Sequence, residues 1–183
     1  MSVVISGTGL FTPKDFITNQ ELVESYNKYA DIYNSENKEE IASGELEALT
    51  HSDAAFIKKV SGIEKRYVLD KKGILDPNRM RPNLAERPND QISIQAEISI
   101  SACMEALDQA GKSASDVDAV ICGCANLQRA YPAVAIEIQK ELGIEGYAYD
   151  MNVACSSSTF ALQNAVNDIL SGVADCILVV NPD

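Results

Sequence analysis

Residues 147–163 read Tyr-Ala-Tyr-Asp-Met-Asn-Val-Ala-Cys-Ser-Ser-Ser-Thr-Phe-Ala-Leu-Gln, and the chain continues to Cys-Ile-Leu-Val-Val-Asn at 176–181. The start of this stretch, about 148–153, predicts a buried strand, and the pattern from about 156 to 170 predicts a helix. The apolar run at 176–180 predicts a second buried strand. A strand, a helix and a strand in this order form the crossover unit of a parallel sheet.

Cys155 stands where the first of these strands meets the helix. The hydroxyl side chains at 156–159 favour a helix start, because they can accept hydrogen bonds from the free N–H groups of a first turn. The positive end of the helix dipole favours a thiolate there, and the same N–H groups can hold an oxyanion. This pattern indicates an activated cysteine nucleophile. The alternative is a small core side chain, since cysteine is among the most buried residue types.

The other cysteines fit structural roles. Cys103 falls on the apolar face of a predicted helix, and Cys176 begins a predicted strand. Cys122 and Cys124 lie two residues apart in another strand and therefore share one face. With a single histidine in the chain and no second cysteine pair, we expect no metal site.

The composition restricts the class of protein. The chain has 183 residues and a net charge of −12, which argues against nucleic acid as the main partner. Residues 1–183 show no signal-peptide pattern and no long apolar run, so we expect no signal peptide and no membrane association. Five cysteines without framework spacing indicate a reducing, cytoplasmic location.

The remaining elements can be placed from local patterns. Residues 117–124 form an almost continuous apolar run, typical of a strand that is buried on both faces of a parallel sheet. The other expected features are a first strand at 2–9, a helix capped by Thr18 and Glu21, a surface insertion at about 31–50, a short helix ending at Gly62, a strand at 63–69, a loop at about 70–90, and helices at 92–110 and 134–142. The predicted fold class is α/β, with a mostly parallel sheet flanked by helices.

These features together resemble the N-terminal half of a β-ketoacyl-acyl-carrier-protein synthase III, in the thiolase-like superfamily. The resemblance covers nearly all of residues 1–183 apart from the two excursions, and a C-terminal half is expected outside them. The stretches that carry it are Ile5-Ser-Gly-Thr-Gly-Leu-Phe-Thr-Pro13 with Thr18-Asn19, Phe56-Ile57 with Ser61-Gly-Ile-Glu-Lys-Arg66, Ala130-Tyr-Pro-Ala133 with Leu142-Gly-Ile144, and Asp150-Met-Asn-Val-Ala-Cys155-Ser156.

The resemblance implies a decarboxylative Claisen condensation in fatty-acid synthesis. Cys155 would take an acyl group from an acyl-CoA, and malonyl-acyl-carrier protein would then lose CO2 and attack the acyl-cysteine. Acyl-CoA and acyl-carrier protein are the implied partners, and no further cofactor is expected. Other thiolase-like condensing enzymes, such as polyketide-starter, quinolone-type or hydroxymethylglutaryl-CoA synthases, share the nucleophile and remain alternatives.

Two aromatic residues match substrate-binding positions of the family. Tyr131 matches an aromatic residue that crosses a homodimer interface and lines the partner's acyl pocket, although an ordinary aromatic before a proline is the alternative. Phe56 stands where the family often has a tryptophan that stacks on the CoA adenine. Val60 replaces an arginine near the CoA phosphates, and Arg79, Arg81 and Arg87 are potential substitutes, but a solvated loop is the simpler interpretation.

The family takes its decarboxylation histidine and asparagine from the C-terminal half, so we expect the 183 residues to be inactive alone. His51, the one histidine, does not match a catalytic position and is interpreted as a surface residue. We expect an exposed apolar face where the other half would lie. A non-catalytic half that docks a carrier protein is a further hypothesis, which the net charge of −12 disfavours because carrier proteins are themselves acidic.

Overall fold

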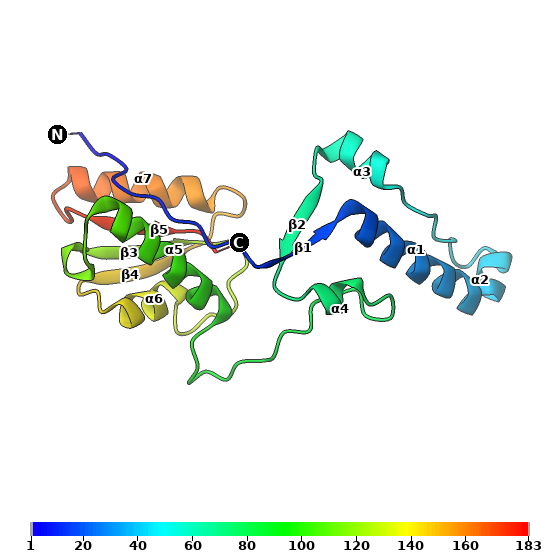
Figure 1. Ribbon diagram of the computed structural model, residues 1–183. Helices are drawn as coiled ribbons and strands as arrows, with labels where there is room; N and C mark the ends of the chain where they lie inside the picture. The colour runs from blue at the N-terminus through cyan, green and yellow to red at the C-terminus, as the bar shows by residue number, and fades with distance from the viewer. Residues whose placement is uncertain (1, 183) are drawn as a thin grey trace. The chain divides into compact units, whose positions relative to one another are not determined.

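The computed structural model describes residues 2–182 and divides them into two compact units (Figure 1). One unit combines the segment up to Phe11 with the chain from Arg87 onward, and the other runs from Thr12 to Glu86. No helix of the described residues is long and apolar enough to cross a membrane.

The larger unit contains a parallel three-stranded sheet. Its strands are β3 (Ala119–Gly123), β4 (Tyr147–Met151) and β5 (Ile177–Val180), in the order β4-β3-β5. The central strand β3 is buried along its whole length, as its continuous apolar sequence predicts. The expectation of an α/β fold with a mostly parallel sheet is confirmed.

Helices cover both faces of this sheet. They are α5 (Ile94–Ala110), α6 (Val134–Leu142) and α7 (Ser157–Leu170), and Figure 1 shows α7 on the opposite side of the sheet from α6. The alternation along β3 explains the layers, because Val120 and Cys122 join one core cluster with α5 and α6. Ile121, one residue out of phase, instead packs with Ala161 and Ala165 of α7.

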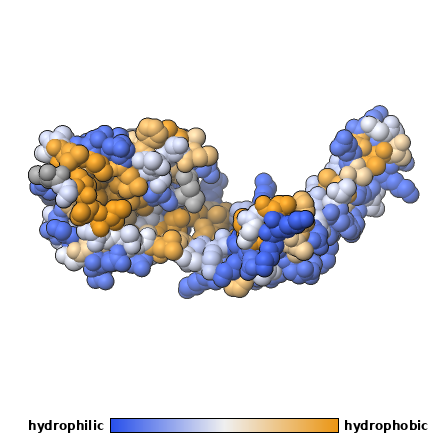
Figure 2. Space-filling view, turned by 90° about the horizontal axis from the view of Figure 1, so that it is seen from above, coloured by the Kyte–Doolittle hydropathy of each residue, from blue (hydrophilic) through white to orange (hydrophobic). Residues whose placement is uncertain are grey.

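The other face of α7 is not covered by described residues. Large apolar side chains on α7 and on the turn that follows it stay exposed, and Figure 2 shows apolar side chains gathered on this side of the larger unit. Four of these side chains are Phe160, Leu162, Leu170 and Val173. The expected exposed apolar face is therefore present.

The prediction of a first strand at 2–9 is wrong. Residues 2–9 form no strand, and Val4 and Ile5 are exposed. The segment runs along α5 instead, with the N–H of Thr8 donating to Gln109 Oε1 at 2.6 Å and the N–H of Leu10 donating to Glu105 Oε2 at 2.8 Å. Because side chains of a helix take these donors, no ladder with a neighbouring strand forms.

Glycine explains how the segment approaches the helix so closely. A Cβ added at Gly7 would collide with the carbonyl oxygen of Ala106, and a Cβ added at Gly9 would collide with that of Ala102. The sequence pattern predicts that these two glycines are part of a strand and a tight turn. In the structure they instead allow the backbone to approach α5 closely.

The smaller unit is built on an antiparallel ribbon of β1 (Asp15–Thr18) and β2 (Lys65–Val68). The predicted cap of the first helix is confirmed, since Glu21 N–H donates to Thr18 Oγ1 at 3.2 Å and Thr18 N–H donates to Glu21 Oε2 at 3.0 Å. Its helices are α1 (Asn19–Glu36), α2 (Lys38–Ser43), α3 (Ala54–Ser61) and α4 (Lys71–Leu75).

Both predicted excursions contain regular structure. The interval 31–50 begins inside α1 and continues through α2 to Gly44, whose positive φ of 82° ends that helix. The interval 70–90 contains α4, because Asp70 Oδ1 accepts a capping hydrogen bond from the N–H of Gly73 at 3.2 Å. Asp70 Oδ2 also accepts from the N–H of Asn83, which ties the following loop to the start of α4.

Candidate functional site

A tight turn between β4 and α7 presents Cys155. Ala154 adopts a positive φ of 48°, a conformation that costs a non-glycine residue about 1 kcal/mol or more. Asn152 Oδ1 accepts from the N–H of Ala154 at 3.0 Å and supports this conformation. The chain therefore reverses sharply just before Cys155, whose side chain is exposed.

Ser157 holds the turn from the inside of the protein. Its buried hydroxyl accepts from the N–H of Val153 at 2.8 Å and donates to the carbonyl oxygen of Ala154 at 2.7 Å. The expectation that the hydroxyls at 156–159 cap the helix is wrong. Ser157 bonds the turn, Ser156, the N-cap, makes no side-chain capping bond, and no described first-turn N–H donates to Ser158 or Thr159. The physical reason is that the turn's own buried polar groups need partners first.

N–H groups at the start of α7, next to Cys155 in the chain, therefore lack capping partners. Within residues 2–182, no acceptor is hydrogen bonded to the N–H of Cys155, Ser158 or Thr159. These donors stand at the positive end of α7, where a developing negative charge is stabilised. The site can hold both a thiolate and an oxyanion.

Exposure separates Cys155 from the other four cysteines. Cys122 and Cys124 are fully buried in the sheet layer, and burial raises the pKa of the Cys103 thiol to about 11. Burial also raises the pKa of Cys176, which is half-buried at the edge of β5. Because the thiolate is the nucleophilic form, these four are unsuited to attack a substrate.

Asp150 links the Cys155 turn to the segment that carries Tyr131. Its two carboxylate oxygens accept from the N–H groups of Val134 and Ala135 at 2.9 and 2.8 Å, which caps α6. Sequence reasoning missed this role. The available signal was a carboxylate inside an otherwise apolar strand, which requires a hydrogen-bonding partner.

Tyr131 lies in the loop before α6 and, as a residue, is 85% exposed. A buried ion pair holds this loop, because Arg129 Nη1 lies 3.3 Å from Glu137 Oε1. Glu137 also accepts from the N–H and the hydroxyl of Ser93, at 3.1 and 2.5 Å. The loop is thus fixed to the starts of both α5 and α6 while Tyr131 itself is free to contact a partner.

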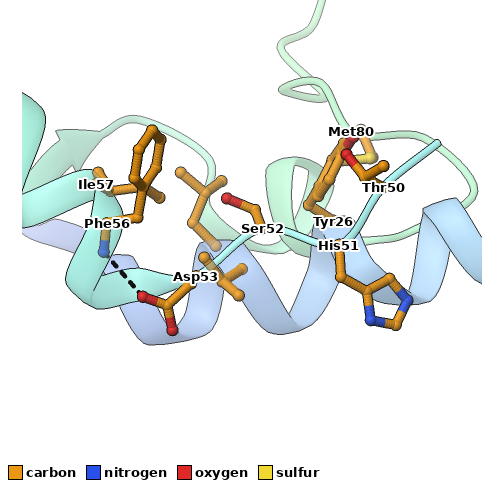
Figure 3. A pocket seen from close by; sticks show the side chains of 10 residues that line it. Tyr26, Thr50, His51, Ser52, Asp53, Phe56, Ile57 and Met80 are labelled. Atoms are coloured by element: carbon orange, nitrogen blue, oxygen red, sulfur yellow. Dashed lines mark hydrogen bonds between the residues drawn. The ribbon is translucent and has the colours of Figure 1, made fainter.

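Phe56 lies in the smaller unit, on α3, and is 60% exposed. It borders a cavity of about 510 Å³ between α1 and α3, whose lining includes Tyr26, Thr50 and Met80 (Figure 3). Asp53 caps α3 by accepting from the N–H of Phe56 at 2.8 Å. The cavity is lined by Leu22, Val23, Tyr26, Thr50, His51, Ser52, Asp53, Phe56, Ile57 and Met80.

His51 occupies a surface position, as predicted. Its Nε2 lies 2.8 Å from Asp31 Oδ1, and both side chains are more than half exposed. Among the described residues, no group of three or more His, Cys, Asp or Glu side chains is placed to hold a metal ion.

Comparisons with known proteins identify the family. The family described as Thiolase, N-terminal domain matches residues 91–181, which include Cys155. The β-ketodecanoyl-[acyl-carrier-protein] synthase of Pseudomonas aeruginosa is 56% identical over 161 residues, which are 88% of this chain and 46% of that protein. The chain belongs to the thiolase-like superfamily, as an N-terminal half of the β-ketoacyl-acyl-carrier-protein synthase III type.

A second curated relative agrees with this assignment, and a solved structure shares the fold. A β-ketoacyl-[acyl-carrier-protein] synthase III from Dinoroseobacter shibae is 34% identical over 78% of this chain and 38% of its own length. The crystal structure of 3-oxoacyl-[acyl-carrier-protein] synthase III from Aquifex aeolicus matches with a TM-score of 0.68 and 24% identity, over 97% of this chain and 43% of that one. The chain spans less than half the length of the curated relatives described.

Proposed function

We propose that this thiolase-like half carries the nucleophile of a β-ketoacyl-acyl-carrier-protein synthase, a condensing acyltransferase of fatty-acid synthesis. One observation carries the proposal: Cys155 is exposed at the N-terminus of α7 beside uncapped N–H groups, while the other four cysteines are buried or half-buried. The names of the relatives support the reaction type. A cytoplasmic location is part of this proposal, because thiols such as that of Cys155 stay reduced there.

The first half-reaction makes an acyl-enzyme. The Cys155 thiolate gives an electron pair to the carbonyl carbon of an acyl-CoA, and the carbonyl π electrons move to the oxygen. The N–H of Cys155 donates to this oxyanion, and a second donor would come from outside residues 2–182. When the tetrahedral intermediate collapses, the C–S bond to CoA breaks, and the CoA thiolate leaves with its electron pair.

The second half-reaction makes the carbon–carbon bond. A malonyl thioester on the carrier protein loses CO2, and the electrons of the broken bond form an enolate. Its carbon attacks the acyl group, and the Cys155 thiolate leaves. The resemblance places the histidine and asparagine that would hold the enolate oxygen in the C-terminal half. The exposed apolar face of α7 supports an association with that half.

We infer the donor chain length from the name of the Pseudomonas aeruginosa relative. A β-ketodecanoyl product is two carbons longer than its acyl donor, because malonyl contributes two carbons after CO2 is lost. We therefore propose octanoyl-CoA as the preferred donor of this chain as well. The exposed Phe56 supports an aromatic contact to the CoA adenine, and the exposed Tyr131 supports a homodimer in which it lines the partner's acyl pocket.

Labelling with octanoyl-CoA tests the proposal. We expect radiolabelled octanoyl-CoA to acylate the full chain once, and Cys155→Ala to remain unlabelled. Cys176→Ala removes a half-buried thiol from the same unit and should keep the label. Label that persists in Cys155→Ala would show that another residue is the nucleophile. Stronger labelling by acetyl-CoA would overturn the chain-length proposal only.

A further inference from the structure

The net charge of −12 conceals a local reversal of sign. Residues 54–81 hold eight of the fifteen Lys and Arg residues but only three of the 27 acidic ones, a net charge of +5. Residues 12–53 hold ten acidic and three basic residues. An acidic partner is therefore repelled by most of the chain and attracted by one segment, since screening limits both effects to about 8 Å at physiological salt.

The ribbon formed by β1 and β2 concentrates this charge on one face. Phe16 and Tyr67 are directly opposite in the antiparallel register, and their rings meet edge to face at 6.2 Å. Lys65 Nζ lies 5.0 Å from the centre of the Phe16 ring and 4.9 Å from that of Tyr67, and Lys71 Nζ lies 5.7 Å from that of Phe16. We call these four residues the ribbon face.

Alternation along the strands separates this face from the interior. Ile17, between Phe16 and Thr18, is buried, and Arg66, its partner in the register, donates to Asn19 Oδ1 at 2.9 Å. The rings of Phe16 and Tyr67 point the other way, and these two residues are 40% and 48% exposed. Two large rings exposed side by side are unusual for a solvated surface and typical of an interface.

The charge of the ribbon face is only partly neutralised. Lys71 pairs with Glu21 at 2.6 Å, whereas Lys65 forms no ion pair with any residue from 2 to 182. Cation–π contact with two rings replaces a carboxylate partner, but it leaves the positive charge of Lys65 available. An acidic side chain of a partner protein can complete this site and lie over the rings at the same time.

We propose that the ribbon face docks an acidic acyl-carrier protein. This inference rests on the proposed function, which requires a carrier-bound malonyl group. Charge complementarity favours this occupant over extended polyanions, because an anionic membrane or a nucleic acid would also approach the acidic remainder of the chain. The repulsion expected from the net charge therefore does not apply to residues 54–81.

Binding of a purified bacterial holo-acyl-carrier protein to the full chain tests the inference. At low salt, we expect Lys65→Glu to raise the Kd about tenfold, which equals about 1.4 kcal/mol. Lys28→Glu makes the same charge change on α1, outside the ribbon face, and should alter the Kd less than twofold. Tyr67→Ser keeps the charge and should still weaken binding about threefold, because it removes exposed ring surface.

The result is separable from the acylation assay. Octanoyl-CoA labels Cys155 without a carrier protein, so a failure of labelling and a failure of docking are distinct outcomes. The docking proposal is overturned if the unaltered chain does not bind the carrier, or if Lys65→Glu and Lys28→Glu weaken binding equally. Binding of phosphatidylglycerol vesicles that depends on Lys65, without carrier binding, would assign the face to a lipid surface instead.

Discussion

The Cys155 turn and the ribbon face are fixed by different kinds of interaction. The turn depends on partly buried hydrogen bonds, those of Ser157 to the backbone and of Asp150 to the start of α6. The ribbon face consists of exposed rings and ammonium groups, of which only Lys71 has an ion-pair partner. Buried hydrogen bonds resist salt and fail when one atom is removed, whereas surface charges are screened and tolerate substitution.

This difference fits the different requirements of a nucleophile and of a docking surface. A nucleophile needs a geometry held to a fraction of an ångström, which a buried network provides. A docking surface needs long-range attraction and fast release, which exposed charges provide. We therefore expect single substitutions to be costly around the turn and mild on the ribbon.

The largest expected effect is at the buried ion pair behind Tyr131. Glu137→Ala leaves Arg129 buried without its carboxylate, and we expect the free energy of unfolding to fall by about 3–5 kcal/mol. Urea denaturation measures this change. Glu141→Ala, on the exposed side of the same helix, should cost less than about 0.5 kcal/mol. Equal effects of the two variants would contradict the buried network.

Ser157→Ala should have an intermediate effect. It removes the two hydrogen bonds that the buried Ser157 hydroxyl makes in the turn, so we expect a loss of about 1–3 kcal/mol in stability and slower acylation of Cys155. Ser158→Ala changes an exposed hydroxyl one residue away and should leave both quantities unchanged. If acylation were as fast in Ser157→Ala as in the unaltered protein, the turn would not depend on this hydroxyl.

The smallest effect is expected at the edge of the ribbon face. The ammonium of Lys71 and the capping bond from Thr18 lower the pKa of Glu21 to about 2. A lowered pKa in the folded state means that this group contributes stability above its ordinary pKa of 4.5, and that the contribution is lost as the pH falls towards 2.

Melting temperatures between pH 5 and pH 2 measure this contribution. Glu21→Gln should melt with a smaller loss of stability across this range than the unaltered protein. Glu36→Gln removes an exposed carboxylate from the other end of α1 and is the control. An unchanged pH profile in Glu21→Gln would show that the Lys71 pair does not persist in solution.

Features that depend on a few neighbouring residues could be predicted from the sequence. The cap of Thr18 and Glu21, the ends of helices at Gly62 and Gly143, and the position of Cys155 between a strand and a helix all appear where the patterns place them. In each case the residues that interact are no more than about five positions apart, so the pattern contains both partners.

Features that depend on distant partners could not be predicted. Residues 2–9 have a strand-like composition, but the side chains of Glu105 and Gln109, about a hundred residues away, take their donors. The role of Asp150 was missed for the same reason, because the N–H groups that donate to its carboxylate belong to the start of α6. The net charge is a similar case, because it averages the basic residues 54–81 with an acidic remainder and so hides where the charges lie.

The exposure of Cys155 also has an experimental use. A maleimide fluorophore or nitroxide will attach first at this position, because the other cysteines are buried or half-buried. The unaltered sequence therefore accepts a spectroscopic reporter at the start of α7 without prior removal of the other thiols. Its rotational mobility would record in real time when a second polypeptide covers the apolar side of that helix.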